Sequence, residues 1–259
     1  MAIAAAAWKN RCFAIVRRIM IKKCLIGLLA VILLAGMVFC LYVSDYYRAD
    51  QTAIAALKSD LVQVKETEFG WLLDGPSEDA ALIFYPGAKV EETAYAPLLH
   101  RLAEKGVDVC LLKMPCRLAF LGTDKAGHVM RTYDYTHWYV GGHSLGGAVA
   151  ATFAARHGQE LDGVVLLAAY PTEKLDEKLT EISLYGTEDL ILNRKRTEEG
   201  KAFAPKAFVE HVISGGNHAQ FGNYGIQKGD GKAEISADEQ QKETVEVICR
   251  VLMEQKTVN

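Results

Sequence analysis

Ser144 lies in the middle of the segment Gly141–Gly147, which carries the pattern G-x-S-x-G. His137–Val140, just before it, is aromatic and β-branched and predicts a short buried strand. Ala148–Arg156, just after it, is rich in alanine and predicts a helix that ends at Gly158. A turn this sharp strains the backbone at its apex, and the flanking glycines leave room for the packed chain. The pattern predicts an exposed serine hydroxyl at a helix N-terminus, where backbone N–H groups favour negative charge. The alternative is a glycine-rich turn with an incidental serine.

A serine hydroxyl becomes an effective nucleophile at neutral pH when a histidine removes its proton and a carboxylate fixes the tautomer of that histidine. Two later loops offer these groups in the order acid, then histidine. Asp189 follows the predicted strand Ile182–Tyr185, and His218 follows the predicted strand Ala207–Ile213. Glu188 competes for the acid position, but we prefer Asp189 because its shorter side chain can point back over the edge of the sheet.

Seven histidines compete for the role of the base. Only His218 lies in a glycine-rich loop at the end of the final predicted strand. His143 is adjacent to Ser144, but its side chain should point away from the hydroxyl. The other five lie on predicted helices or strands, or in a segment without a clear pattern: His100, His128, His137, His157 and His211. Ser144, Asp189 and His218 are therefore the candidate catalytic residues.

A tetrahedral intermediate needs two backbone N–H groups aimed at its oxygen, the oxyanion hole. Leu145, directly after the serine, should supply one of them. The loop after the predicted strand Ala80–Tyr85 should supply the other, with Ala88 as first choice and Lys89 as second. Gly87 permits the close approach that this arrangement requires.

Strands alternate with helices through most of the chain, which predicts an α/β fold with a doubly wound, mostly parallel sheet. An antiparallel pair at 62–68 and 71–73 should precede the parallel strands. The other predicted strands are 80–85, 107–113, 137–140, 161–169, 182–185 and 207–213. The predicted helices are 46–61, 95–104, 124–131, 148–156 and 236–254.

The connection from Ala168 to Glu181 is only about a dozen residues, so a cap over the site should be small or absent. Tyr170 and Pro171 are candidates for the rim of the active site. A simpler interpretation of Pro171 is that it ends a strand. The glycine-rich segment Asn223–Gly231 is another candidate for the mouth of the site. Its Asp230 has too few partners to form a Ca²⁺ site.

Residues 24–43 are uncharged and apolar, and about 20 such residues can cross a bilayer as a helix. Residues 1–23 contain six bases and no acid, which predicts that this end stays in the cytoplasm and the body lies outside the cell membrane. The predicted plan is a basic cytoplasmic N-terminus (1–23), a single-pass anchor in the lipid bilayer (24–43), a linker or helix (44–61) and an α/β domain (62–259). A cleaved signal peptide, which would leave a secreted protein, is the second choice. Translation from Met20 is an alternative start.

The remaining composition excludes some functions. Beyond residue 23, 23 bases face 32 acids, which argues against nucleic acid as a partner. Cys110, Cys116 and Cys249 show neither a C-x-x-C pattern nor metal-type spacing. We expect mostly buried thiols, with at most an optional Cys110–Cys116 link, and no metal or cofactor.

The chain resembles the α/β-hydrolase superfamily, and more closely its compact bacterial branch of dienelactone-hydrolase-like enzymes. The segments that carry the resemblance are Tyr85–Ala88, Lys113–Pro115, Gly141–Gly147, Tyr185–Asp189 and Gly215–Gly222. The resemblance implies an α/β-hydrolase fold with Ser144 as nucleophile, Asp189 as orienting acid and His218 as base.

The expected activity is hydrolysis of carboxylic esters or related acyl bonds through an acyl-enzyme. The expected substrates are small or surface-presented acyl esters, because a small cap leaves the site open. Two alternatives remain: acyl transfer or amide cleavage by the same residues, and a non-catalytic, membrane-tethered binding protein that keeps the fold.

Overall fold

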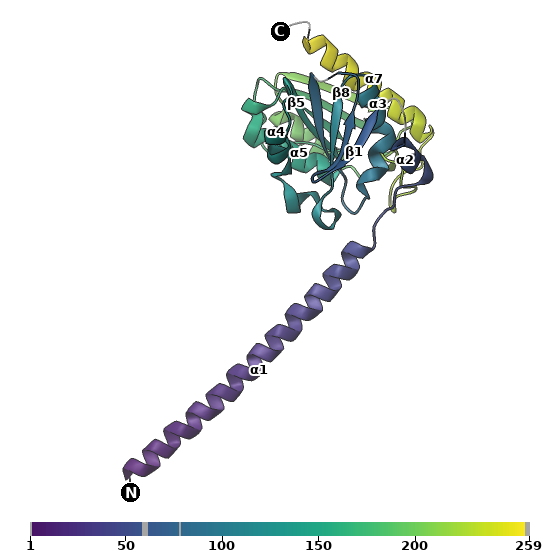
Figure 1. Ribbon diagram of the computed structural model, residues 1–259. Coiled ribbons are helices and arrows are strands. Elements are labelled where there is room, and N and C mark those ends of the chain that lie inside the picture. Colours follow the sequence, from purple (N-terminus) through teal and green to yellow (C-terminus); the bar gives the residue numbers. More distant parts are fainter. Residues whose placement is uncertain (1, 59–61, 78, 257–259) are drawn as a thin grey trace. The chain divides into compact units, whose positions relative to one another are not determined.

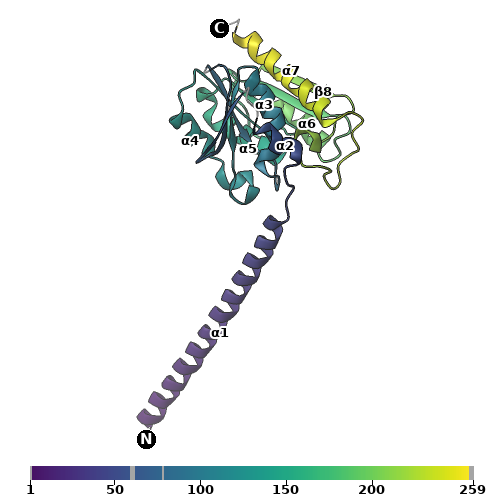
Figure 2. The same ribbon diagram turned by 45° about the vertical axis from the view of Figure 1, so that its right-hand side comes forward.

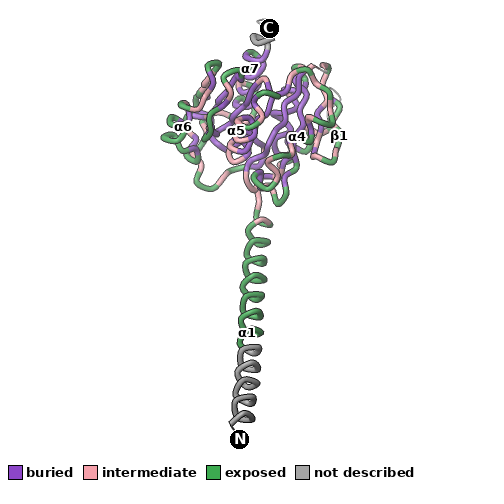
Figure 3. Tube along the Cα trace, turned by 90° about the vertical axis from the view of Figure 1, so that its left-hand side faces the viewer, coloured by how far each residue is buried: buried purple, intermediate pink, exposed green. Residues whose placement is uncertain are grey.

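The structure is a computed structural model that describes residues 2–58, 62–77 and 79–256. It contains two units, Met1–Asp45 and Tyr46–Asn259. The first is a single helix, α1 (Ala2–Ser44). Its stretch Met20–Ser44 has a mean hydropathy of 2.9 and is long enough to cross a membrane, although a signal sequence near an N-terminus has the same properties. Nearly all described side chains of this stretch are exposed (Figure 3).

The second unit, here called the α/β domain, is built on an eight-stranded sheet of order β1-β2-β4-β3-β5-β6-β7-β8 (Figure 1). The strands are β1 (Gln63–Thr67), β2 (Gly70–Asp74), β3 (Ala80–Tyr85), β4 (Asp108–Leu112), β5 (His137–His143), β6 (Gly163–Leu167), β7 (Thr180–Gly186) and β8 (Ala207–Ile213). β2 is antiparallel to β1 and β4, and every other neighbouring pair is parallel. The predicted mostly parallel sheet with an antiparallel beginning is therefore confirmed.

Helices cover both faces of the sheet (Figures 1 and 2). Leu82 and Phe84 of β3 pack in one apolar cluster with α3 (Ala96–Glu104) and α7 (Ala237–Lys256). Ile83 and Tyr85 pack in the other with α4 (Lys125–Thr132) and α5 (Leu145–His157). This alternation follows from the two-residue period of a strand, and it explains why β3 is a continuous apolar run buried on both sides.

The shorter helices lie in the connections. They are α2 (Gln51–Ala56), α6 (Arg194–Gly200), η1 (Glu92–Tyr95), η2 (Pro115–Arg117), η3 (Ala119–Gly122), η4 (Gly158–Glu160), η5 (Lys201–Phe203) and η6 (Ala219–Phe221). A capping box begins α7, because Ser236 and Glu239 bond each other's backbone N–H groups.

The helix predicted over 46–61 is shorter in the structure. Asp50 caps α2 by accepting from the Ala53 N–H at 2.9 Å, so the helix begins only at Gln51. The preceding residues are extended, and Tyr47 forms a parallel bridge with Val90 after β3. Residues 59–61 of the predicted helix lie outside the described residues.

The six parallel strands β3–β8 all begin at one edge of the sheet, here called the amino edge, and end at the other, the carboxyl edge. The β6–β7 connection, residues 168–179, leaves β6 at the carboxyl edge and contains no helix or strand. The predicted minimal cap is confirmed. Cys110 is buried and Cys116 exposed, and both thiols are free, so the optional link between them does not form.

Candidate active site

Ser144 stands between the end of β5 and the start of α5 with φ 54° and ψ −122°. A positive φ is costly for a residue with a side chain, about 1–3 kcal/mol, and marks the apex of the turn as strained. Gly146 is required here, because a Cβ on it would lie 2.1 Å from the Tyr85 carbonyl oxygen. The strained apex that the G-x-S-x-G pattern predicts is present, and the Ser144 side chain is half-buried.

Ser144 and His218 line one pocket of about 310 Å³ at the carboxyl edge. Leu145 also lines it, and Tyr170, one of the two predicted rim residues, does so too, whereas Pro171 does not. The other lining residues are Ala148, Ala168, Ala169, Thr172, Ile191, Leu192 and Asn193. The structure thus brings a serine hydroxyl, a histidine and a helix N-terminus to one concave surface.

Asp189 is the acid that meets His218. Its Oδ2 lies 2.8 Å from His218 Nδ1, and both side chains are almost fully buried. Its Oδ1 accepts from the N–H groups of Ile191 at 2.9 Å and Leu192 at 2.8 Å. Glu188, the competing carboxylate, accepts from the Thr187 hydroxyl instead. The loop after β7 therefore directs the shorter side chain to the histidine and holds it there by backbone donors.

The pairing decides which nitrogen of His218 is free. A carboxylate at Nδ1 keeps the proton there, so Nε2 of the neutral ring is the unprotonated, basic nitrogen. Nε2 is buried and has no hydrogen-bond partner in the described part of the chain, the Ser144 hydroxyl included. It is a basic nitrogen without a partner in a residue that lines the same pocket as the strained serine, as a proton acceptor would. Such hydrogen bonds are often absent before substrate binds.

The loop after β3 presents one unoccupied backbone donor. Gly87 N–H donates to the Tyr95 hydroxyl at 3.1 Å, and Lys89 N–H donates to the Arg117 carbonyl at 2.9 Å. The Ala88 N–H makes no such bond among the described residues, which favours it over Lys89 as an oxyanion donor. Ala88 does not line the pocket of Ser144.

His143 and Tyr95 form a buried contact that the sequence did not reveal. The Tyr95 hydroxyl accepts from Gly87 N–H, so its own proton is donated to His143 Nδ1 at 2.8 Å. The His143 ring packs against the His218 ring with centroids 4.5 Å apart. Burial, and then the nearby His218, hold the pKa of His143 well below its usual value. A neutral His143 thus supports the ring of His218 without competing for its proton.

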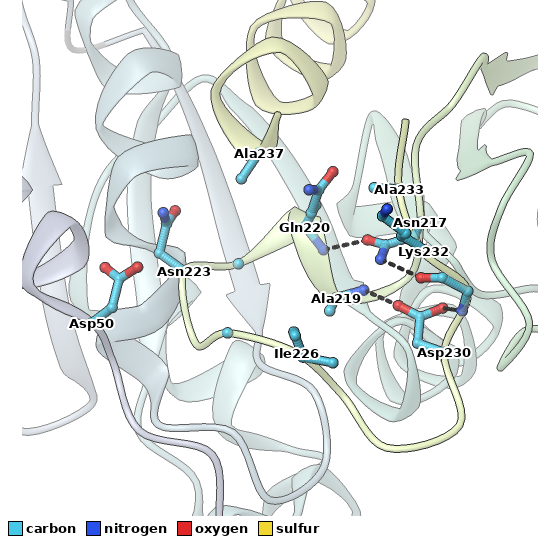
Figure 4. Close-up of a pocket in the computed structure, with 13 residues that line it drawn as sticks. Asp50, Asn217, Ala219, Gln220, Asn223, Ile226, Asp230, Lys232, Ala233 and Ala237 are labelled. Atoms are coloured by element: carbon cyan, nitrogen blue, oxygen red, sulfur yellow. Dashed lines mark hydrogen bonds between the residues drawn. The ribbon is translucent and has the colours of Figure 1, made fainter. Parts of the chain in front are cut away.

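Asp230 joins the two loops that carry Asp189 and His218, and its bond to Ala219 is drawn in Figure 4. Its carboxylate accepts from the N–H groups of Ala219 at 2.9 Å and His218 at 3.3 Å, and from Leu190 N–H at 3.4 Å. These backbone donors occupy the oxygens that a Ca²⁺ ion would need. No group of three or more metal-binding side chains occurs in the described ranges. Only one sign of this role for Asp230 was present in the sequence, namely that it is an acidic residue within a glycine-rich segment.

The glycine-rich segment Asn223–Gly231 does not line the pocket of Ser144, contrary to one expectation. It lines a separate hollow of about 430 Å³ together with Asp50 and the start of α7 (Figure 4). Asp230 holds the segment against the backbone of Ala219, which lines the same hollow.

The chain is similar to known proteins in sequence pattern and in fold. A sequence profile described as "Alpha/beta hydrolase family" matches residues 81–242. No curated protein matches the chain. Est1E from Butyrivibrio proteoclasticus has a TM-score of 0.54 and 14% identity, covering 74% of this chain and 99% of its own. The dienelactone hydrolase from Anabaena variabilis has a TM-score of 0.52 and 12% identity, with coverage of 75% and 98%. The thermophilic esterase Est2 from Thermogutta terrifontis has a TM-score of 0.53 and 13% identity, with coverage of 75% and 94%. At such identities the likeness is one of fold.

Proposed function

Because the chain belongs to the alpha/beta hydrolase family, we propose that it hydrolyses carboxylic esters with Ser144 as nucleophile, His218 as general base and Asp189 as the carboxylate that orients the base. The observation that carries this proposal is the His218–Asp189 pair at 2.8 Å on the pocket that Ser144 also lines. Solved structures with the same fold include an esterase and a dienelactone hydrolase, which supports ester chemistry.

The proposed reaction follows from the positions of these groups. Ser144 Oγ attacks the acyl carbon while His218 Nε2 takes its proton, and the negative oxygen accepts from the N–H groups of Leu145 and Ala88. The C–O bond to the alcohol then breaks as Nε2 returns the proton to the leaving oxygen. Water attacks the acyl-enzyme with the same proton transfers and restores the Ser144 hydroxyl.

The proposed substrates are small or surface-presented acyl esters. The β6–β7 connection contains no helix or strand to roof the pocket, so a long, enclosed acyl tunnel has no walls there. An open site also admits water to the acyl-enzyme, which favours hydrolysis over transfer to another acceptor.

We place the α/β domain outside the cell membrane, held by residues 24–43 as a single-pass anchor. The support is the apolar helix stretch Met20–Ser44 with the basic residues on its N-terminal side. A signal peptide cleaved to release the domain remains the second choice.

Hydrolysis of p-nitrophenyl butyrate by the full chain in detergent tests the proposal. Ser144→Ala should reduce kcat by at least about 10³-fold with an unchanged circular dichroism spectrum, since removal of a catalytic nucleophile leaves only binding and oxyanion stabilisation. Ser77→Ala, before β3 at the amino edge, is the matched control. Equal activity of the Ser144→Ala and Ser77→Ala variants would refute the proposal. Added hydroxylamine separates the alternatives, because a transferase would form mainly the hydroxamate.

A further inference from the structure

Exposed apolar side chains of the α/β domain gather at the carboxyl edge. Of the large apolar residues exposed in the described part of this domain, five lie in loops after parallel strands: Phe120, Leu121, Leu190, Ile191 and Ile226. The remaining two are Ile54 in α2 and Val212 in β8. Ile226 is 94% exposed and Leu190 is 72% exposed, so most of each residue's surface is in contact with water. Such a concentration on one side of a domain marks an interaction surface.

The domain's first residues lie at this same edge. Tyr47 N–H donates to the Lys89 carbonyl at 2.8 Å, in the loop after β3. The Tyr47 hydroxyl accepts from Lys228 N–H at 3.1 Å, and its ring lies 5.4 Å from that of Tyr224. The loop that carries Ile226 is therefore packed against Tyr47.

Chain length limits how far this edge can be from a membrane. Only Asp45 and Tyr46 separate Tyr47 from Ser44, the last residue of the apolar stretch. Three residues span at most about 10 Å when fully extended. An anchor that ends at Ser44 therefore keeps Tyr47, against which the Ile226 loop packs, within about 10 Å of the end of the apolar stretch. Lys228 and Lys232 are exposed on the same loop and suit anionic headgroups.

The apolar surface continues from this loop to the pocket of Ser144. Asp230 accepts from Leu190 N–H, and a Cβ on Gly229 would lie 3.6 Å from the Ile191 Cδ1 atom. The Ile226 loop therefore packs against the segment after β7. Ile191 itself lines the pocket that contains Ser144 and His218.

We propose that the carboxyl edge is a membrane-contact surface, with Ile226 in the headgroup layer, and that the substrate is an acyl ester of a membrane amphiphile that reaches Ser144 past Ile191. This inference rests on the proposed function and on residues 24–43 as an anchor. The lipid bilayer is the expected partner of this surface, because the apolar side chains, Lys228, Lys232 and the start of the domain at Tyr47 all lie at the carboxyl edge.

A depth measurement on the full chain in nanodiscs of phosphatidylcholine and phosphatidylglycerol tests the contact without using activity. Bimane is attached through Ile226→Cys after Cys12, Cys24, Cys40 and Cys116 have been replaced by serine. Glu177→Cys, an exposed position before β7 at the amino edge, is the matched label site. Doxyl lipids should quench the label at 226 at least threefold more than the label at 177. Equal quenching at the two sites would overturn the proposal.

A substrate comparison tests the second half. Ile226→Gln combined with Phe120→Gln should lower hydrolysis of a long-chain acyl ester embedded in the nanodisc by at least tenfold, and leave hydrolysis of p-nitrophenyl butyrate within twofold. Val212→Gln, on the edge strand, should change neither rate. Parallel losses on both esters, or no loss on either, would contradict the proposed substrate class. A wild-type chain that hydrolyses neither ester would instead refute the proposed function, while the quenching result still decides the membrane contact.

Discussion

The carboxyl edge of the sheet contains non-glycine residues with positive φ, whereas the described residues at the amino edge contain none. The non-glycine residues with positive φ in the described ranges all lie at the carboxyl edge: Lys89, Cys116, Arg117, Ser144 and Ala168. At the amino edge, Asp108 accepts from Gly75 N–H and Asp162 from Trp138 N–H. The contrast shows that strain is confined to the edge where we propose that chemistry occurs, as expected when strain serves function.

The largest effect should come from the acid of the proposed triad. Asp189→Asn keeps an acceptor for Ile191 and Leu192 but presents an amide to His218, which favours the wrong tautomer. We expect kcat for p-nitrophenyl butyrate to fall by about 10³–10⁴-fold, with little change in the free energy of unfolding. The control is Glu188→Gln on the same loop, which should retain activity within twofold. Equal losses in the two variants would show that His218 does not depend on Asp189.

Gly146 tests the packing that creates the strained turn. In Gly146→Ala the new Cβ would lie 2.1 Å from the Tyr85 carbonyl oxygen and 2.4 Å from that of Pro86, so the backbone must move. We expect a loss of about 1–3 kcal/mol in unfolding free energy and at least tenfold in kcat. Gly127→Ala in α4, where the nearest atom is 3.4 Å away, should be neutral or stabilising. A fully active, stable Gly146→Ala variant would show that the close packing at Gly146 is not required for the strained turn.

Asp230 tests whether backbone donors hold the His218 loop. Asp230→Asn weakens charge-assisted bonds to Ala219 and His218, worth about 1.5–3 kcal/mol each when intact. We expect roughly tenfold lower kcat, unchanged KM and faster hydrogen exchange over 217–222. A change in the pH dependence of kcat should accompany it, because His218 is displaced from Asp189. Asp124→Asn is the control, since the Asp124 side chain makes no cap hydrogen bond. Uniformly faster exchange with normal kcat would reduce Asp230 to a purely structural role.

Two tyrosine variants compare the edges directly. Tyr95→Phe leaves Gly87 N–H and His143 Nδ1 without their partner, and Tyr135→Phe removes a 2.8 Å bond to Asp108. Each should lower stability by about 1–3 kcal/mol. Only Tyr95→Phe should also lower kcat, by about threefold to tenfold, because Gly87 adjoins the proposed oxyanion donor. Similar kinetics in the two variants would remove the functional distinction between the edges.

The smallest effect concerns a buried acid at the amino edge. Burial, and then Glu210, raise the pKa of Glu181 from 4.5 to about 8. Between these values the folded chain retains a proton that the unfolded chain releases, so stability falls as pH rises from about 4.5 to about 8. Glu181→Gln should remove this slope, and its melting temperature should gain a few degrees over wild type between pH 5 and pH 8.5, with unchanged kcat. A constant difference across that range would contradict the assignment.

The fold could be predicted because its central strands, such as β3, β4 and β6, are nearly continuous apolar runs bounded by turn residues. Ala80–Tyr85 and Ala207–Ile213 were predicted with the bounds that the structure has. α6 was missed because Arg194–Gly200 is short and polar, and its cap at Asn193 is the only local signal. The helix over 46–61 was predicted too long, because pairing of Tyr47 with Val90 depends on residues far apart in sequence.

The candidate site also contains residues that local patterns could predict and residues that they could not. Ser144, Asp189 and His218 follow strands in a recognisable order, so local patterns sufficed to nominate them. Tyr95 and Asp230 act on distant backbone groups, and no spacing connects either of them to its partners. Contacts of this kind require the folded chain.

Labelling of the full chain with a fluorophosphonate probe, read by peptide mass spectrometry, shows whether Ser144 is an activated nucleophile. We expect modification of Ser144 and its loss in His218→Ala, while Ser77 stays unmodified. Labelling that persists in folded His218→Ala, or a folded wild-type chain that is not labelled at Ser144, would contradict the claim that the carboxyl edge holds an activated serine.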